Sequence, residues 1–288
     1  MLVPTMKQRT EAIQTRLRLI APQIIQARVP FAPVEYRPLR APGFRTDAID
    51  YDSPDAGWSV IPPGSYWGTW QTHFEMRTGY QIPADWDTHA TLALHLPFGD
   101  AKEFEHPEAL VSIDGVSLAA MDTHHQVIML PEAFKDHAPH ALYLRGWTGL
   151  GGGFWGMGDK QTLYMESPAV VLIDLELEQF VTAAQTALDT VKLLDDLQPA
   201  KYDLLTALES AFYMLDLRHP LGAGFRESIN SALIALKMVL KNSGVPHPLT
   251  VHGVGHAHID TAWMWSTRET RGKVERTFHT ALHMMEAV

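Results

Sequence analysis

The spacing of apolar residues changes along the chain and predicts alternating helical and extended segments. Between residues 6 and 26 apolar side chains recur at helical spacing, so we expect an N-terminal helix. Pro22 should kink or split that helix, because proline lacks a backbone donor and crowds the preceding turn. Prolines and glycines then gather between residues 30 and 64, which indicates an extended connector.

Residues 65–178 have the pattern of short strands. Apolar and polar residues alternate, or apolar residues run together, at 91–96, 109–113, 126–130, 140–147 and 170–177. Asp114-Gly115 follows the second of these segments and is typical of a two-residue hairpin turn. Several short strands separated by turn signals favour a β-sandwich.

The helical pattern returns between Glu178 and Lys241, where apolar stripes predict a spacer of three helices. Residues 249–255 then predict a strand that runs on into residues 256–260. Ser266 and Glu269 have the spacing of a capping box at the start of a final helix. That helix should bury a stripe made of Val274, Phe278, Leu282 and Met285.

These segments predict a multidomain α and β fold in four parts. The parts are an N-terminal helix with a proline-rich connector (1–62), a β-sandwich (63–178), a helical spacer (179–245) and the first β-α unit of an α/β barrel-like catalytic domain (246–288). One β-α unit cannot bury its own strand, so we expect a truncated catalytic domain that belongs to a longer chain.

Charge and composition disfavour some classes of partner and limit the kinds of metal site. The net charge of −10 disfavours nucleic acid or an anionic membrane surface as a partner, since both need a basic face. The chain has no cysteine, so a metal site would use histidine and carboxylate ligands. Residues 1–18 lack the apolar core of a signal peptide, and no apolar run is long enough to span a membrane. A cytoplasmic location is expected, with vacuolar delivery left open.

The residues from His256 to Asp260 offer a metal-binding pattern. Residues two apart in an extended segment share a face, which places His258 and Asp260 together, and His256 with them if the strand reaches that far. An imidazole and a carboxylate at the carboxyl end of a strand suit Zn²⁺. An isolated pair with this spacing is common by chance, and strand-end residues that cap a helix or bind solvent are its plain alternative.

A family resemblance adds to this pattern. The stretch G-H-A-H-I-D-T-A-W-M-W followed by R-E-T-R-G-K-V-E-R-T-F, between Gly255 and Phe278, resembles the opening of the catalytic domain of glycoside hydrolase family 38 α-mannosidases. It is most similar to the cytosolic, vacuolar and bacterial branch. The resemblance implies that His258 and Asp260 are zinc ligands, that Trp263 forms an aromatic wall for the sugar, and that His256 supports the site without binding the metal.

The resemblance also implies an activity. The family hydrolyses terminal α-mannosidic bonds of oligosaccharides or glycoconjugates with retention, using two carboxyl groups and a zinc ion, for which cobalt can substitute. The nucleophile, the acid/base and the remaining zinc ligand would lie after residue 288, so no catalytic residue is assigned within this chain. We expect the 288 residues alone to bind zinc weakly and to leave mannosides intact. A homo-oligomer is left open.

Two other functions fit parts of the sequence. An amidohydrolase-type barrel uses an H-x-H pair at the end of its first strand, which His256 and His258 could supply. A carbohydrate-binding or architectural β-sandwich without catalysis could use Trp67, Trp70, Trp147 and Trp155 as a sugar platform. Packing in the core or between domains is the commoner role of such tryptophans.

Overall fold

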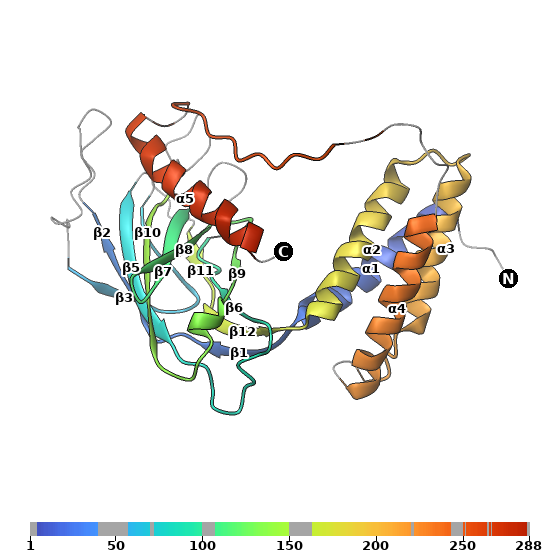
Figure 1. The fold of residues 1–288 in the computed structure, drawn as a ribbon, viewed down its shortest axis with the longest axis horizontal. Coiled ribbons are helices and arrows are strands. Elements are labelled where there is room, and N and C mark those ends of the chain that lie inside the picture. Colours follow the sequence, from blue (N-terminus) through green and yellow to red (C-terminus); the bar gives the residue numbers. More distant parts are fainter. Residues whose placement is uncertain are drawn as a thin grey trace. The chain divides into compact units, whose positions relative to one another are not determined.

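The computed structural model contains two compact units, each built from separate stretches of the chain (Figure 1). One unit combines residues 1–27 with 172–253, and the other combines residues 28–171 with 254–288. The structure describes residues 5–39, 57–69, 72–99, 107–149, 163–219, 222–242, 250, 252–263, 265 and 267–286. The mixture of helices and sheets predicted from the sequence is confirmed.

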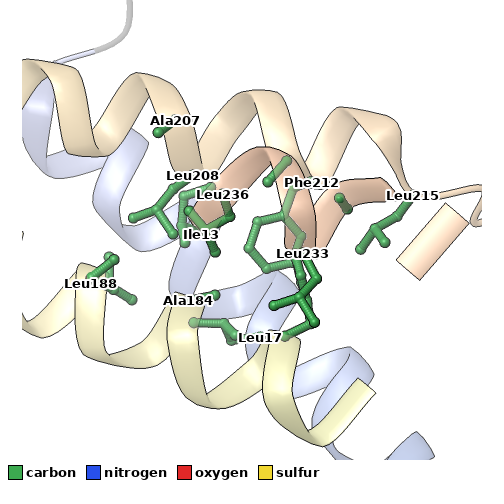
Figure 2. Close-up of a cluster of buried hydrophobic side chains, with 14 of the residues drawn as sticks. Ile13, Leu17, Ala184, Leu188, Ala207, Leu208, Phe212, Leu215, Leu233 and Leu236 are labelled. Carbon is green, nitrogen blue, oxygen red and sulfur yellow. The ribbon is translucent and has the colours of Figure 1, made fainter. Parts of the chain in front are cut away.

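The first unit is a bundle of helices around an apolar core. Its helices in the described part are α1 (Met6–Ile20), α2 (Leu175–Leu193), α3 (Pro199–Met214) and α4 (Ala223–Asn242). Figure 2 shows the shared core, to which α1 contributes Ile13 and Leu17 and α3 contributes Leu208 and Phe212. Burial of a leucine, isoleucine or phenylalanine stabilises the fold by about 1.5–3 kcal/mol. The helices predicted between residues 178 and 241 are therefore confirmed, and α1 joins them.

The N-terminal helix is shorter than the apolar spacing predicted. It begins after Thr5, whose hydroxyl accepts a hydrogen bond from the backbone of Gln8, and it ends at Ile20. A 3-10 turn (Ala21–Ile24) follows, and strand β1 (Ile25–Pro30) begins where helix was expected. Pro22 explains the difference, because it lies in the first turn of the 3-10 segment, where a missing backbone donor costs little. No helix of the described residues has both the length and the apolar character to cross a membrane.

The second unit is built mainly from strands. Within the described ranges one sheet has the strand order β3-β2-β5-β10-β7-β8, a second has the order β1-β12-β6-β9, and β4 pairs with β11. The strands not yet bounded are β2 (Val34–Pro38), β3 (Ser59–Ile61), β4 (Ser65–Tyr66), β5 (His73–Tyr80), β6 (Leu92–His95), β7 (Glu108–Ile113), β8 (Val116–Met121), β9 (Val127–Met129), β10 (His140–Trp147), β11 (Tyr164–Met165) and β12 (Ala169–Ile173).

The strand predictions can be compared segment by segment. Strands β6, β7, β9 and β10 lie where alternation predicted them, and the first half of 170–177 is strand β12. The turn between β7 and β8 is also confirmed, since Asp114 and Gly115 both have positive φ and Ile113 pairs with Val116. The connector prediction is wrong for β2 and β3, which pair with each other while β2 also pairs with β5. Prolines at 33 and 38 flank the segment between them, so they limit β2 without preventing it.

The two larger sheets share an aromatic cluster. The indole of Trp67 meets Tyr36 of β2 and Phe74 of β5 edge-on, with ring centroids 5.6 and 5.0 Å apart. The same indole lies 6.5 Å from the ring of Phe98, which follows β6, and its Nε1 donates a hydrogen bond of 2.9 Å to the Phe98 carbonyl. Edge-to-face pairs stabilise more than their buried area alone suggests. Trp67 therefore joins residues of both sheets in one core.

Strand β10 can approach its neighbours closely because residue 146 is a glycine. A Cβ atom at Gly146 would clash with the Glu108 carbonyl and would lie 2.7 Å from the Ala109 Cβ and 2.8 Å from the Phe74 ring. We therefore expect Gly146→Ala to destabilise the protein by about 1–3 kcal/mol, the usual cost of overpacking. Urea unfolding measures this, with Gly57→Ala, which has open space for a Cβ, as the control. Equal unfolding midpoints for the two variants would contradict the expectation.

Helix α5 (Thr267–Glu286) packs on strands β7 and β8 (Figure 1). The expected apolar stripe is wrong, since Phe278, Leu282 and Met285 are 54%, 58% and 76% exposed. The buried residues of this helix are polar, namely Glu269, Arg276 and His283. The carboxylate of Glu269 contacts His73 and Arg276. The predicted capping box also involves Ser266, which lies outside the described residues. The polar face of α5 packs on the sheet because Glu108 and His73 of the sheet pair with its charged residues.

Candidate metal site

His258 and Asp260 lie together on an exposed segment that precedes α5. The imidazole Nε2 of His258 is 2.9 Å from Oδ1 of Asp260, and the two side chains are 70% and 47% exposed. Residues two apart in an extended chain project to one side, which brings the two groups together. The pair thus presents one nitrogen and one oxygen atom to the same point in solvent.

These two atoms suit a zinc ion. Zinc bonds of about 2.0–2.2 Å at a tetrahedral centre separate two ligand atoms by roughly 3.3 Å, so the observed pair would need to open by only a few tenths of an ångström. Within the described ranges, no group of three or more histidine, cysteine or acidic residues is placed to hold a metal. Two ligands hold zinc weakly, because catalytic zinc sites use three protein ligands and structural ones four.

His256 lies beside His258 in the same segment. The two imidazole rings stack with centroids 5.8 Å apart and an interplanar angle of 22°. A stacked neighbour restricts the rotation of the His258 ring without supplying a third ligand atom to the pair. His256 and His258 contact each other through their ring faces. His258 and Asp260 instead bring a nitrogen and an oxygen atom to within 2.9 Å of each other.

The strand expected to carry these residues is not formed. Residues 252–260 have no strand assignment and are mostly exposed, while residues 249 and 251 lie outside the described residues. A strand needs a neighbour to satisfy its backbone donors and acceptors, and no strand of the described residues pairs with this segment. The side-chain geometry of His258 and Asp260 is thus set by local chain conformation.

Trp263 follows the pair and is 53% exposed. Its ring meets that of Trp265 edge-on at 5.6 Å, and its backbone N–H donates to the Trp265 carbonyl at 3.2 Å. Trp265 in turn lies under the ammonium group of Lys273, which is 4.2 Å from the ring centroid. About half of the surface of Trp263 is therefore exposed, three residues after Asp260, and Trp265 connects it to α5.

Two of the tryptophans considered for a separate sugar platform are buried. Trp67 and Trp147 are only 3% and 9% exposed, so neither can stack on a sugar. Trp70 and Trp155 lie outside the described residues. The platform interpretation is wrong for the two tryptophans that the structure describes.

Sequence reasoning missed the contacts that hold α5 to the sheet. Glu108, at the start of β7, forms ion pairs with Lys273 and Arg276, and His73 pairs with Glu269. The helical spacing of residues 269, 273 and 276 was visible in the sequence and places them on one face. Nothing in the pattern named their partners, which lie on strands far away along the chain.

Comparison with known proteins finds a family similarity in this segment. Residues 248–288 match the N-terminal domain of the glycosyl hydrolases of family 38. The resemblance to that family is therefore confirmed, and the matched segment is the one that contains His258, Asp260 and Trp263.

Two curated proteins match over a longer stretch. The chain is 30% identical over 128 residues to alpha-mannosidase 2C1 of Mus musculus, a match that covers 40% of this chain and 10% of that protein. It is 30% identical over 129 residues to alpha-mannosidase 2C1 of Homo sapiens, covering 41% of this chain and 10% of that protein. The match thus spans about a tenth of the length of these relatives.

Proposed function

We propose that this chain carries the opening of the catalytic domain of a zinc-dependent, retaining α-mannosidase. One observation supports the proposal. The segment that matches family 38 also contains the imidazole of His258 and the carboxylate of Asp260, which lie 2.9 Å apart. The named activity of the two relatives supports the same substrate class, terminal α-mannosides of oligosaccharides or glycoconjugates. The location proposed for the enzyme is the cytoplasm.

Each residue of the segment has a role in this proposal. His258 and Asp260 would hold the zinc ion, which would supply Lewis-acid stabilisation of the sugar's oxygen atoms. His256 keeps the ring of His258 oriented by stacking on it. Trp263 packs its exposed indole against the apolar face of the sugar and excludes water from that side.

Bond cleavage itself needs two carboxyl groups close to the anomeric carbon, one as nucleophile and one as acid/base. We assign neither to a residue of this chain. We also propose that the 288 residues alone bind zinc weakly and release no mannose, because the described residues bring only two ligands together. Calorimetric titration with zinc and a mannose-release assay on the chain measure both properties.

Metal removal from the enzyme that carries this chain tests the function. Chelation should lower hydrolysis of a chromogenic α-mannoside by at least about 100-fold, because a catalytic metal supplies several kcal/mol of transition-state stabilisation. Addition of zinc should restore the rate, and cobalt should restore part of it. A chelator already saturated with zinc serves as the control.

Two outcomes would reject the proposal. One is a metal-free enzyme that hydrolyses the α-mannoside at the original rate. The other is zinc-dependent cleavage of cyclic amides with no activity on mannosides, which would favour the amidohydrolase function that His256 and His258 suggested.

A further inference from the structure

Three neighbouring strands of the larger sheet present a row of side chains to α5. His73 begins β5, Trp147 ends β10 and Glu108 begins β7. In the antiparallel register Trp147 lies opposite both His73 and Glu108. Directly opposed residues project to the same face of a sheet, so the three side chains form one row across its end.

Helix α5 places three charged residues against this row. Lys273 Nζ is 2.5 Å from Oε1 of Glu108, and Arg276 Nε is 3.2 Å from the other oxygen of the same carboxylate. Glu269 accepts from Arg276 at 3.3 Å, and its second oxygen is 3.0 Å from His73 Nε2. The helix and the sheet thus meet through a continuous set of ion pairs among Glu108, Lys273, Arg276 and Glu269, extended by the contact of Glu269 with His73. We call this set the charge clasp.

The charge clasp is shielded from water. The side chains of Glu108 and Lys273 are each 17% exposed, and that of Arg276 is 8% exposed. Burial acts to raise the pKa of Glu108, but the charges of Arg276 and Lys273 outweigh it and hold that pKa below its usual value. Burial also acts to raise the pKa of Glu269, and the hydrogen bond from His73 with the charge of Arg276 holds it down. Both carboxylates are therefore charged at neutral pH, and each depends on its cationic partner.

Contacts continue from the charge clasp to the candidate site. The ammonium group of Lys273 lies over Trp265, and Trp265 meets the ring of Trp263 edge-on. Thr270, in the first turns of α5, also donates a hydrogen bond to the carbonyl of Thr261, next to Asp260. The segment 252–258 is exposed along its length, so its position depends on the residues that follow it.

We propose that Glu108 and Lys273 are positioning residues through which the sheet orients Trp263. Glu108 fixes Lys273, Lys273 fixes Trp265, and Trp265 sets the angle at which Trp263 meets the sugar. The proposal deepens the function proposed above and rests on it. It gives the β-sheet a role in substrate binding through Glu108, although Trp67 and Trp147 are too buried to stack on a sugar themselves.

The first test measures the charge clasp in the 288-residue chain by hydrogen exchange. Glu108→Gln keeps the shape of the side chain and removes its charge, and Lys273→Met keeps the apolar stem. Either change should accelerate amide exchange in α5 by about 10–100-fold, the factor that matches loss of a charge-assisted hydrogen bond. Strands β2 and β6 should be unaffected. Because the two residues act as one pair, the double variant should be no faster than the singles.

Glu35→Gln is the matched control. Glu35 accepts a hydrogen bond of 2.6 Å from Arg77 in the same sheet, but this pair is exposed and lies away from α5. Exchange in α5 should equal that of the unmodified chain. Acceleration by Glu35→Gln as large as that by Glu108→Gln, or none by either, would overturn the charge clasp.

The second test measures the consequence in the enzyme that carries this chain. Glu108→Gln should lower kcat/KM for an α-mannoside by about 10–100-fold, mainly through a higher KM, while the zinc content stays unchanged. In a Trp263→Ala background, where the sugar contact is already lost, Glu108→Gln should change KM by less than about twofold. A role limited to stability would move neither KM nor this coupling.

The results separate the two proposals. If the unmodified enzyme hydrolyses mannosides with zinc and Glu108→Gln leaves KM unchanged, the positioning role is refuted and the function stands. If Glu108→Gln lowers kcat and zinc content with KM unchanged, the positioning role is refuted as well. If the unmodified enzyme does not act on mannosides, both proposals fail. Hydrogen exchange then still decides whether the charge clasp holds α5 to the sheet.

Discussion

Replacement of His258 or Asp260 by alanine is expected to abolish zinc binding and α-mannoside hydrolysis in the enzyme that carries this chain. Each change removes one of the two proposed ligand atoms, which lie 2.9 Å apart. The loss in kcat/KM should be on the order of 10³-fold or more, because the metal contributes several kcal/mol of transition-state stabilisation. Folding should be unaffected, since both side chains are largely exposed and neither contributes to a core.

His252→Ala provides the matched control for this experiment. His252 lies in the same exposed segment and has no role in the proposed site. Zinc content by elemental analysis, steady-state kinetics and circular dichroism on the three variants give the comparison. A double variant of His258 and Asp260 that keeps its zinc and its rate would show that the pair is not the metal site.

Trp67→Ala should be the most destabilising of the single changes considered. Trp67 is 3% exposed and its ring is surrounded by Tyr36, Phe74 and Phe98. Truncation of a buried aromatic residue to alanine costs about 3–5 kcal/mol, through lost burial and the cavity that remains. Trp67→Phe keeps part of the ring but leaves the Phe98 carbonyl without its donor, which should cost about 1–3 kcal/mol. Chemical denaturation measures both changes.

Trp58→Ala is the control for Trp67. Trp58 lies on the outer side of the sheet, where the guanidinium groups of Arg37 and Arg77 are 4.6 and 4.4 Å from its ring centroid. Loss of such exposed cation–π contacts costs about 0.5–1 kcal/mol each. If Trp67→Phe left stability unchanged and instead weakened binding of oligomannose, Trp67 would be part of a sugar platform and its assignment to the core would be wrong.

The sequence predicted correctly those features that depend on residues close together in the chain. Asp114-Gly115 predicted its hairpin because positive φ at both turn positions is accessible to aspartate and glycine at little cost. Strands with clear alternation and helices with an apolar stripe were predicted for the same reason, since burial of one face imposes the period of the element. The family resemblance rested on a short run of residues, and the match to the family covers that run.

Features that depend on distant partners could not be predicted. The sequence of α5 has an apolar and a polar face, and burial of the apolar one is the ordinary expectation. The polar face is buried because Glu108 and His73 compensate its charges, and their register across β10 is fixed only by the folded sheet. In the same way, periodicity showed that α1 has an apolar face but not that α2–α4 would cover it.

The discontinuous make-up of the helical bundle has a consequence for synthesis. Helix α1 ends at Ile20, whereas the first helix that covers its apolar face, α2, begins at Leu175. At about 5–20 residues per second, a ribosome needs roughly 8–30 s to make the intervening chain. During that time Ile13 and Leu17 have no partner, and the strands between are completed first. The nascent polypeptide therefore leaves the apolar side chains Ile13 and Leu17 uncovered until α2 has been made.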